Sequence, residues 1–195
     1  MKLNPLINFC SALAPVSNEI IELLRENAII LSVCKNTQLH PDGMGGDNAI
    51  FITSGTLRKY TAIENKQITL SLYGENELIG FTEIANYLED ERLEAIHDSE
   101  LILLPKDFVE GLYGNYPEVD KMARKIFSMK YQKMVCESRL CRLPSADHRY
   151  RLFNIANGKY RLPARILASY LVMREETLSR LKTKNKDKNQ IKCGV

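Results

Sequence analysis

Short runs of apolar residues, separated by turn residues, occupy the region from Ala28 to Pro105. The runs are rich in Ile, Leu, Thr and Tyr, and the segments between them contain Gly, Pro, Asn and Asp. Even spacing of this kind predicts six or seven strands in a small antiparallel sandwich or barrel. Within it, residues 50–62 alternate across Ser54-Gly55, which predicts a hairpin with one solvent-exposed face.

Helical patterns flank this β region. Ser17 is a suitable cap for a helix that ends near Asn27. Pro117 is well placed as the first residue of a second helix, whose apolar positions recur in steps of three and four with only Lys133 interrupting them. At about 26 residues this helix is about 39 Å long. Its apolar stripe consists of Met122, Ile126, Met129, Cys136 and Leu140.

A helix of this length exceeds what a domain of this size needs for its own core. It either lies along the β region or pairs with the same helix of a second copy. We favour the dimer, because Tyr131 and Met134 stand beside the stripe and widen the apolar surface.

The last quarter of the chain predicts short helices. Ser145 is a cap, Gly158 a stop signal and Pro163 a first helical residue. Two short helices separated by three residues are typical of a helix-turn-helix. The predicted elements are a helix over 145–156, a short strand over 160–162, a helix over 163–171 and a helix from Glu175.

The net charge of +3 on 195 residues conceals two opposite parts. Residues 1–144 contain 15 Lys and Arg against 20 Asp and Glu, and residues 145–195 contain 12 against 4, giving charges of −5 and +8. A basic segment at one end of an acidic chain indicates contact with a polyanion, first nucleic acid and second an acidic membrane surface. A solvated lysine-rich tail is the alternative.

Several classes of protein are not expected. The five cysteines include no CxxC pair, which argues against a zinc site and favours reduced thiols in a cytoplasmic protein. Asn4, Pro5 and Asn8 interrupt any signal peptide, and no stretch is long enough to span a membrane. We find no nucleophile with a base, no carboxylate pair and no phosphate loop, so we do not expect an enzyme.

The order of these elements, together with three motifs, resembles the Crp/Fnr superfamily of bacterial transcription regulators. The segment 52–58 is similar to the family's strand-Ser-Gly-strand hairpin, 122–124 to its long helix, and 168–180 to its helix-turn-helix with a Glu-x-x-Ser-Arg pattern. The resemblance covers almost the whole chain. It implies an α+β fold: an antiparallel β-roll or jelly roll over 1–116, a long dimerisation helix over 117–143 and a winged helix-turn-helix over 144–195. The tail from Lys184 is too short for a full wing hairpin.

Base recognition is assigned to one helix face. Glu176, Ser179 and Arg180 are three and four residues apart and project from one side of a helix in the major groove. Arg can bind guanine, a carboxylate can accept from cytosine N4, and a hydroxyl suits several base edges. A solvated Glu/Arg pair is the ordinary alternative. The DNA-binding set is Glu175, Glu176, Ser179, Arg180, Arg165 and Lys182, with Arg149, Arg151 and Lys184 as further phosphate contacts.

Two departures from the family pattern affect the turn. Val172 stands where Gly is frequent, and a β-branched residue resists positive φ. Arg174 replaces a capping Ser. They motivate a second hypothesis, a ligand-binding or protein-interaction module whose helix-turn-helix no longer recognises DNA.

Members that bind cyclic AMP hold it with a Gly-Glu pair and an Arg-Ser/Thr-Ala triplet. Here Gly80 precedes Phe81, and Arg92 precedes Leu93-Glu94 in a charged loop over 89–94. The residues on the long helix that would meet the adenine are Met129 and Lys130. Only Gly80 and Arg92 survive, so cyclic AMP is not the expected effector.

Other cofactors are not expected either. An iron-sulfur cluster needs several cysteines near the N-terminus, where Cys10 stands alone, and a haem would rely on His40 or His97 as a single ligand. The predicted partners are therefore double-stranded DNA, a second copy of the chain, a small-molecule effector and RNA polymerase, without a membrane.

Overall fold

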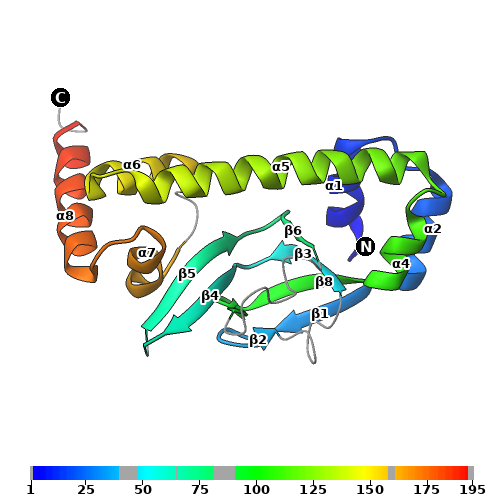
Figure 1. The fold of residues 1–195 in the computed structure, drawn as a ribbon, viewed down its shortest axis with the longest axis horizontal. Helices are drawn as coiled ribbons and strands as arrows, with labels where there is room; N and C mark the ends of the chain where they lie inside the picture. The colour runs from blue at the N-terminus through cyan, green and yellow to red at the C-terminus, as the bar shows by residue number, and fades with distance from the viewer. Residues whose placement is uncertain (1, 40–47, 65, 81–90, 158–160, 193–195) are drawn as a thin grey trace.

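The computed structural model describes residues 2–39, 48–64, 66–80, 91–157 and 161–192 (Figure 1). Its strands form two four-stranded antiparallel sheets, in the orders β1-β8-β3-β6 and β2-β7-β4-β5. This agrees with the predicted antiparallel β domain. The strands are β1 (Ile29–Val33), β2 (Gln38–Leu39), β3 (Asn48–Ser54), β4 (Leu57–Ile63), β5 (Lys66–Tyr73), β6 (Leu78–Ile79), β7 (Glu91–Ala95) and β8 (Ser99–Pro105).

Strand β3 lies between two hydrophobic clusters. Its residues Ile50 and Ile52 pack with side chains of both sheets, and Phe51 packs with the helices on the other side. Alternate side chains of a strand point to opposite faces, so both faces of β3 are covered. The predicted solvent-exposed face is therefore wrong for this strand.

The hairpin predicted at Ser54-Gly55 is also wrong. β3 and β4 belong to different sheets, and β4 pairs with β5 and β7. Gly55 has φ +97°, and a Cβ there would lie 2.1 Å from the Ser99 hydroxyl oxygen, so the passage between the sheets needs glycine. Sequence alternation predicts strands but does not distinguish a hairpin from a passage between two sheets.

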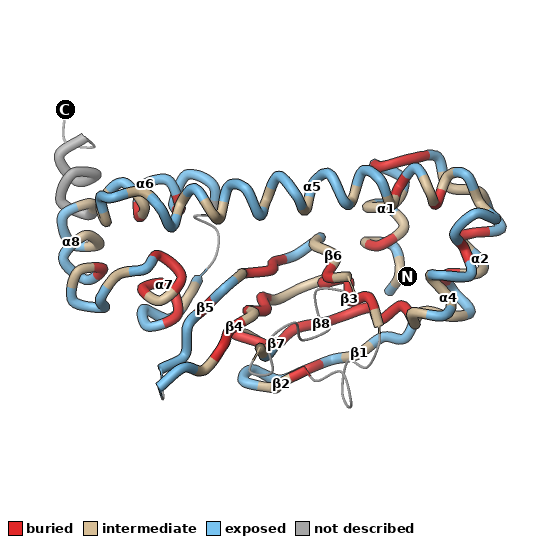
Figure 2. The backbone as a smooth tube through the Cα atoms, in the orientation of Figure 1, coloured by how far each residue is buried: buried red, intermediate tan, exposed pale blue. Residues whose placement is uncertain are grey.

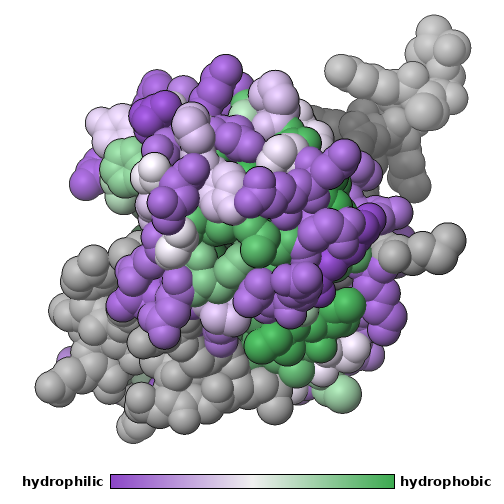
Figure 3. Space-filling model, turned by 90° about the vertical axis from the view of Figure 1, so that its right-hand side faces the viewer, coloured by the Kyte–Doolittle hydropathy of each residue, from purple (hydrophilic) through white to green (hydrophobic). Residues whose placement is uncertain are grey.

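Three short helices cover one end of the β domain: α1 (Asn4–Leu13), α2 (Asn18–Asn27) and α4 (Lys106–Leu112). The predicted cap is confirmed, since the Ser17 hydroxyl accepts a hydrogen bond from the Ile20 amide at 3.4 Å. Helix α1 is an addition to the prediction; its Leu6 is 1% exposed. At this end hydrophobic side chains reach the surface among hydrophilic ones (Figure 3), and Ile29 at the start of β1 is 51% exposed.

Helix α5 (Pro117–Arg142) has the predicted length of 26 residues and runs past the β domain to the C-terminal helices (Figure 1). The predicted stripe partly faces the chain's own body: Met122 is 6% exposed, and Ile126 packs against the helix-and-sheet cluster. Lys133, the apparent interruption, lies on the same side and pairs with Glu77. The other side of α5 is exposed along its length (Figure 2).

The C-terminal part contains α6 (Ala146–Asn157), α7 (Ala164–Tyr170) and α8 (Glu175–Lys192). The predicted strand over 160–162 is not formed at Arg161 and Leu162, and Tyr160 lies outside the described residues. The expected separate tail from Lys184 instead continues α8 as far as Lys192. Up to that residue, the described chain contains no strand after β8.

Candidate nucleic-acid interface

Helices α7 and α8 form a helix-turn-helix around a hydrophobic core that they share with α6. Leu171 and Leu178 are completely buried, and Phe153 of α6 is 2% exposed. Burial of Leu178 fixes the rotation of α8, because residues on the opposite side of a helix must then face outward. The core also includes Leu72 and Ile96 of the β domain, so it joins the two parts of the chain.

The turn between α7 and α8 forms despite Val172. This residue has φ +52° and is 58% exposed. The Met173 amide donates to the Ala168 carbonyl at 3.0 Å and the Val172 amide to the Ser169 carbonyl at 3.1 Å, the pattern of a helix ending in a left-handed residue. The expectation that Val172 alters the turn is wrong, and the left-handed β-branched residue costs about 1–3 kcal/mol of backbone strain.

Arg149 fixes this turn to the long helix. Its Nε donates to the Leu171 carbonyl at 2.7 Å, its Nη2 to the Val172 carbonyl at 3.0 Å, and its Nη1 to the Leu143 carbonyl. Three of the five N–H donors of this guanidinium are therefore engaged by backbone carbonyls of the same chain. Arg149 thus has a structural role in the turn, and its predicted contact with phosphate stays a prediction.

The predicted base-contacting residues project together from α8. Glu175, Glu176, Ser179 and Arg180 are all exposed, and the helical period places Glu176 and Arg180 opposite Leu178. Arg165 is exposed on α7, Lys182 is half-buried, and Arg151 pairs with Asp147 at 3.0 Å. Ahead of this face lies a cleft of about 960 Å³, with the predicted Arg165, Glu175, Glu176 and Arg180 on one wall and Lys66 and Gln67 of β5 on the other.

Hydrogen bonds connect α7 to the edge strand β5. The Ser169 hydroxyl accepts from the Thr69 amide at 2.9 Å and donates to the Gln67 carbonyl at 3.1 Å. Arg165 Nη2 donates to the Gln67 side-chain oxygen at 3.3 Å. The helix-turn-helix is thus attached to the sheet through an otherwise unpaired strand edge.

No family model and no curated protein sequence matches the chain. Solved structures do. FixK2 from Bradyrhizobium japonicum superposes with a TM-score of 0.72 at 15% identity over 83% of this chain and 86% of that one. A candidate transcriptional regulator of the Crp/Fnr family from Eubacterium rectale gives 0.64 at 16% identity, covering 89% and 85%. A variant of CooA from Carboxydothermus hydrogenoformans gives 0.65 at 15% identity, covering 96% and 85%.

The chain has the fold of the Crp/Fnr regulators. Two of the four residues predicted to face an effector line one cavity. Met129 and Lys130 line a cavity of about 250 Å³ with Phe9 and Ile126, and Gly80 and Arg92 are not among the described residues of its lining. Lys130 donates to the Leu78 carbonyl.

Arg92 lies in strand β7 of the Crp/Fnr fold, and not in the expected loop; its side chain is exposed, in agreement with a surface arginine. The next two residues are engaged elsewhere. Leu93 is 5% exposed in the core between the sheets, and Glu94 accepts from Arg58 at 2.7 Å. Phe81 lies outside the described residues.

Sequence reasoning missed Glu137, which joins three parts of the molecule. Its carboxylate on α5 accepts from the Tyr170 hydroxyl of α7 and the Ser71 hydroxyl of β5, both at 3.1 Å. Burial raises the pKa of Glu137, and Glu77 adds to the increase, while Lys133 and the two hydroxyls act in the opposite direction. Burial and the neighbouring Glu137 also raise the pKa of Tyr170. In the sequence, Glu137 lies four residues after Lys133 on a helix, and nothing at that position indicates its hydrogen bonds to Tyr170 and Ser71.

The raised pKa of Glu137 predicts a pH-dependent stability. A carboxyl whose pKa is higher in the folded state favours folding at low pH, and this contribution is lost as pH rises from its ordinary value of 4.5 through the folded value. The neutral variant Glu137→Gln should therefore gain stability relative to the parent as pH rises. Urea unfolding at about pH 4.5 and about pH 7 measures the difference.

The exposed Glu110 on α4 provides the matched control. Glu110→Gln should differ from the parent by the same amount at both pH values. A Glu137→Gln difference that does not change with pH would contradict the burial argument.

The described residues contain neither a group of metal-ligating side chains nor a helix suited to span a membrane. Among the described residues no three His, Cys, Asp or Glu side chains are grouped closely enough to hold a metal ion. In the same part of the chain, no helix combines the length and apolar character needed to cross a membrane.

Proposed function

We propose that this chain is a sequence-specific DNA-binding transcription regulator of Crp/Fnr type. The single observation that carries the proposal is the exposed face of Glu176, Ser179 and Arg180 on α8, held outward by the completely buried Leu178. Three side chains able to bind base edges stand on a helix at the end of a segment of charge +8. The names of the similar structures support a regulatory function and none names an enzyme.

We assign one proposed function to each of three consecutive regions of the chain. Residues 1–116 form the sensor domain, 117–143 the dimerisation helix and 144–195 the DNA-binding domain. Arg165 and Lys182 contact phosphates, and Glu175 and Glu176 lie at the positive end of the α8 dipole. Because the left-handed turn is formed, Val172 no longer favours a module that has lost DNA recognition.

Dimerisation is proposed through the outer side of α5. Phe127, Tyr131, Met134 and Val135 are 74%, 57%, 58% and 37% exposed, and the first three are spaced by four and three residues. Such spacing places them on one side of the helix, where a second copy could cover them. Two copies then present two helix-turn-helix units to half-sites about one helical turn apart.

Cyclic AMP is not the proposed effector. Where a phosphate would be held in cyclic AMP-binding members, Leu93 is committed to the core and Glu94 to a buried ion pair. A carboxylate at that place would also repel a cyclic phosphate. The sensor domain therefore responds to a different effector.

The proposal is tested by selecting bound duplexes from random DNA and measuring their affinity by fluorescence anisotropy. We expect palindromic sites, and a logarithm of affinity that falls linearly with the logarithm of salt concentration. Absence of any retained sequence at low salt would instead favour a module that does not recognise DNA.

Arg180→Ala isolates the base-contacting function. The variant should lose about 1–3 kcal/mol of binding free energy for the selected duplex and almost none for random duplex. Lys184→Ala is the comparison, because loss of an exposed phosphate-contacting lysine weakens both duplexes equally and lowers the salt slope by about one. An unchanged ratio of specific to random binding in Arg180→Ala would refute the recognition assignment.

A further inference from the structure

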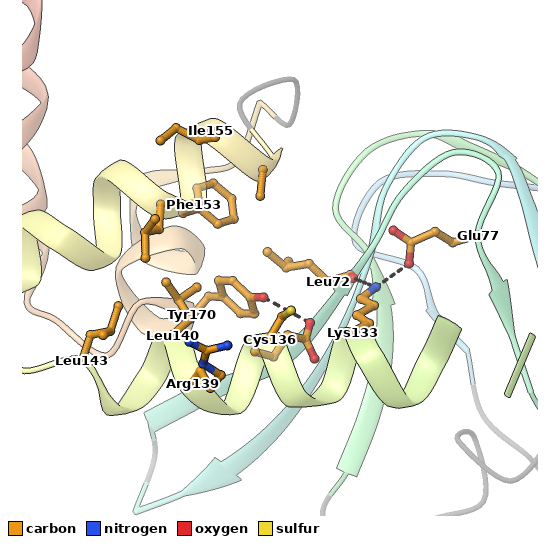
Figure 4. A pocket seen from close by; sticks show the side chains of 13 residues that line it. Leu72, Glu77, Lys133, Cys136, Arg139, Leu140, Leu143, Phe153, Ile155 and Tyr170 are labelled. Carbon is orange, nitrogen blue, oxygen red and sulfur yellow. Dashed lines mark hydrogen bonds and ion pairs between the residues drawn. The ribbon is translucent and has the colours of Figure 1, made fainter. Parts of the chain in front are cut away.

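A cavity of about 530 Å³ lies where the C-terminal half of α5, helices α6 and α7 and strand β5 meet (Figure 4). It adjoins the small cavity at Met129 and Lys130, with which it shares Glu77 and Lys133. Its lining spans the connection between α5 and α6, and comprises Leu72, Glu77, Lys133, Cys136, Glu137, Arg139, Leu140, Leu143, Leu152, Phe153, Ile155, Ala156 and Tyr170.

The walls are mainly apolar. Leu140 and Leu143 line one side, and Phe153 and Ile155 face them from α6 (Figure 4). Ile155 is 83% exposed, an unusual degree for a large apolar side chain that borders a cavity. A volume of this size at a domain junction, with apolar walls and few polar groups, is typical of small-molecule sites.

Most of the polar lining groups already have partners within the protein. Lys133 pairs with Glu77 and donates to the Leu72 carbonyl at 2.6 Å. Glu137 receives its two hydroxyl donors from Tyr170 and Ser71. Arg139 differs: it is exposed at the cavity and takes part in none of the ion pairs or hydrogen bonds found among the described residues. Arg139 is therefore the cation of the described lining whose donors are left for a ligand.

We propose that this cavity binds an amphipathic carboxylic acid, with its apolar chain among the leucines and Phe153 and its carboxylate at Arg139. Burial of the chain supplies most of the affinity, and the guanidinium supplies orientation through a paired hydrogen bond. A cationic ligand would meet Arg139 with like charge, while a fully apolar one would leave the arginine unused.

A ligand in this cavity touches both sides of the connection at Leu143, since Leu140 precedes it on α5 and Phe153 follows it on α6. Occupancy therefore favours one orientation of the helix-turn-helix relative to the β domain. This consequence rests on the proposed function, whereas ligand binding itself does not. The binding test is accordingly made without DNA.

Decanoate and decan-1-ol are suitable probes, because they share a chain and differ in the charged group. Isothermal calorimetry on the full chain should show one decanoate per chain, and Arg139→Gln should weaken decanoate by about tenfold without changing decanol. Arg124→Gln, an exposed arginine on α5 outside the cavity, should bind decanoate as the parent does. Ala156→Trp fills the cavity and should abolish binding of both probes.

Three results would overturn the proposal. Equal binding of decanoate by Arg139→Gln and Arg124→Gln would remove Arg139 from the site. Undiminished binding by Ala156→Trp would place the ligand elsewhere. A parent that binds neither probe while Ala156→Trp dissociates a dimer would assign the cavity to the interface between two copies. None of these outcomes depends on whether the protein binds DNA.

Discussion

Replacing Arg58 with methionine should lower the free energy of unfolding by about 3–5 kcal/mol. Arg58 is 2% exposed, and its Nε and Nη2 lie 2.7 Å and 2.6 Å from the same carboxylate oxygen of Glu94. Nη2 also donates to the Gln67 side chain at 2.6 Å, and the guanidinium carbon lies 4.3 Å from the centre of the Tyr60 ring. Methionine keeps much of the packing but leaves Glu94 without its cation.

The double variant Arg58→Met/Glu94→Gln separates charge from packing. It removes both charges, so most of the lost stability should return, because the large cost arises from one uncompensated buried charge. The exposed pair Arg25–Glu22 is the control, and Arg25→Met should cost less than about 1 kcal/mol. Urea unfolding monitored by circular dichroism measures all variants. An Arg58→Met loss below about 1 kcal/mol would contradict the buried-pair argument.

Arg58 also connects the core of the β domain to the helix-turn-helix. Gln67 accepts from Arg58 and from Arg165 with the same side-chain oxygen, and its backbone carbonyl accepts from Ser169. The ion pair inside the sheet thus positions the strand edge on which α7 rests. Damage to this pair should affect both stability and the orientation of the residues proposed to bind DNA.

Local signals in the sequence predicted the helices well. The Ser17 cap, the Pro117 start and the α7–α8 unit need only a few neighbouring residues to form, so a short window of sequence contains the information. The same holds for the exposure of Arg180, because Leu178 and Arg180 lie on different sides of one helix.

The pattern of apolar and polar residues does not predict contacts between segments that are distant in the sequence. Arg149 was assigned to phosphate because its neighbours are basic, but its partners are backbone carbonyls 6, 22 and 23 residues away. Arg58 and Glu94 meet only because β4 pairs with β7. The type of a residue does not show whether a backbone carbonyl or a paired strand will lie beside it. For this reason, a structural arginine cannot be distinguished from a solvent-exposed one in a sequence.

Replacing Tyr131 and Met134 with aspartate should convert the proposed dimer into monomers, with a dissociation constant at least about 100-fold higher. Each side chain is more than half exposed in the single chain, so the substitutions leave its core intact. In a symmetric dimer each aspartate occurs twice, and like charges meet where apolar surface was buried. Sedimentation equilibrium over a concentration series measures the constant.

Gln132→Asp is the matched control, because Gln132 is exposed on α5 between the outer side and the side that faces the β domain. It adds the same charge to the same helix and should leave the dimer intact. Loss of the dimer should also weaken binding to a palindromic duplex, because a monomer binds only one half-site at a time. Binding to random duplex should be affected less. If the double aspartate variant stays dimeric with an unchanged constant, the second copy contacts another surface, and the outer side of α5 has a different partner.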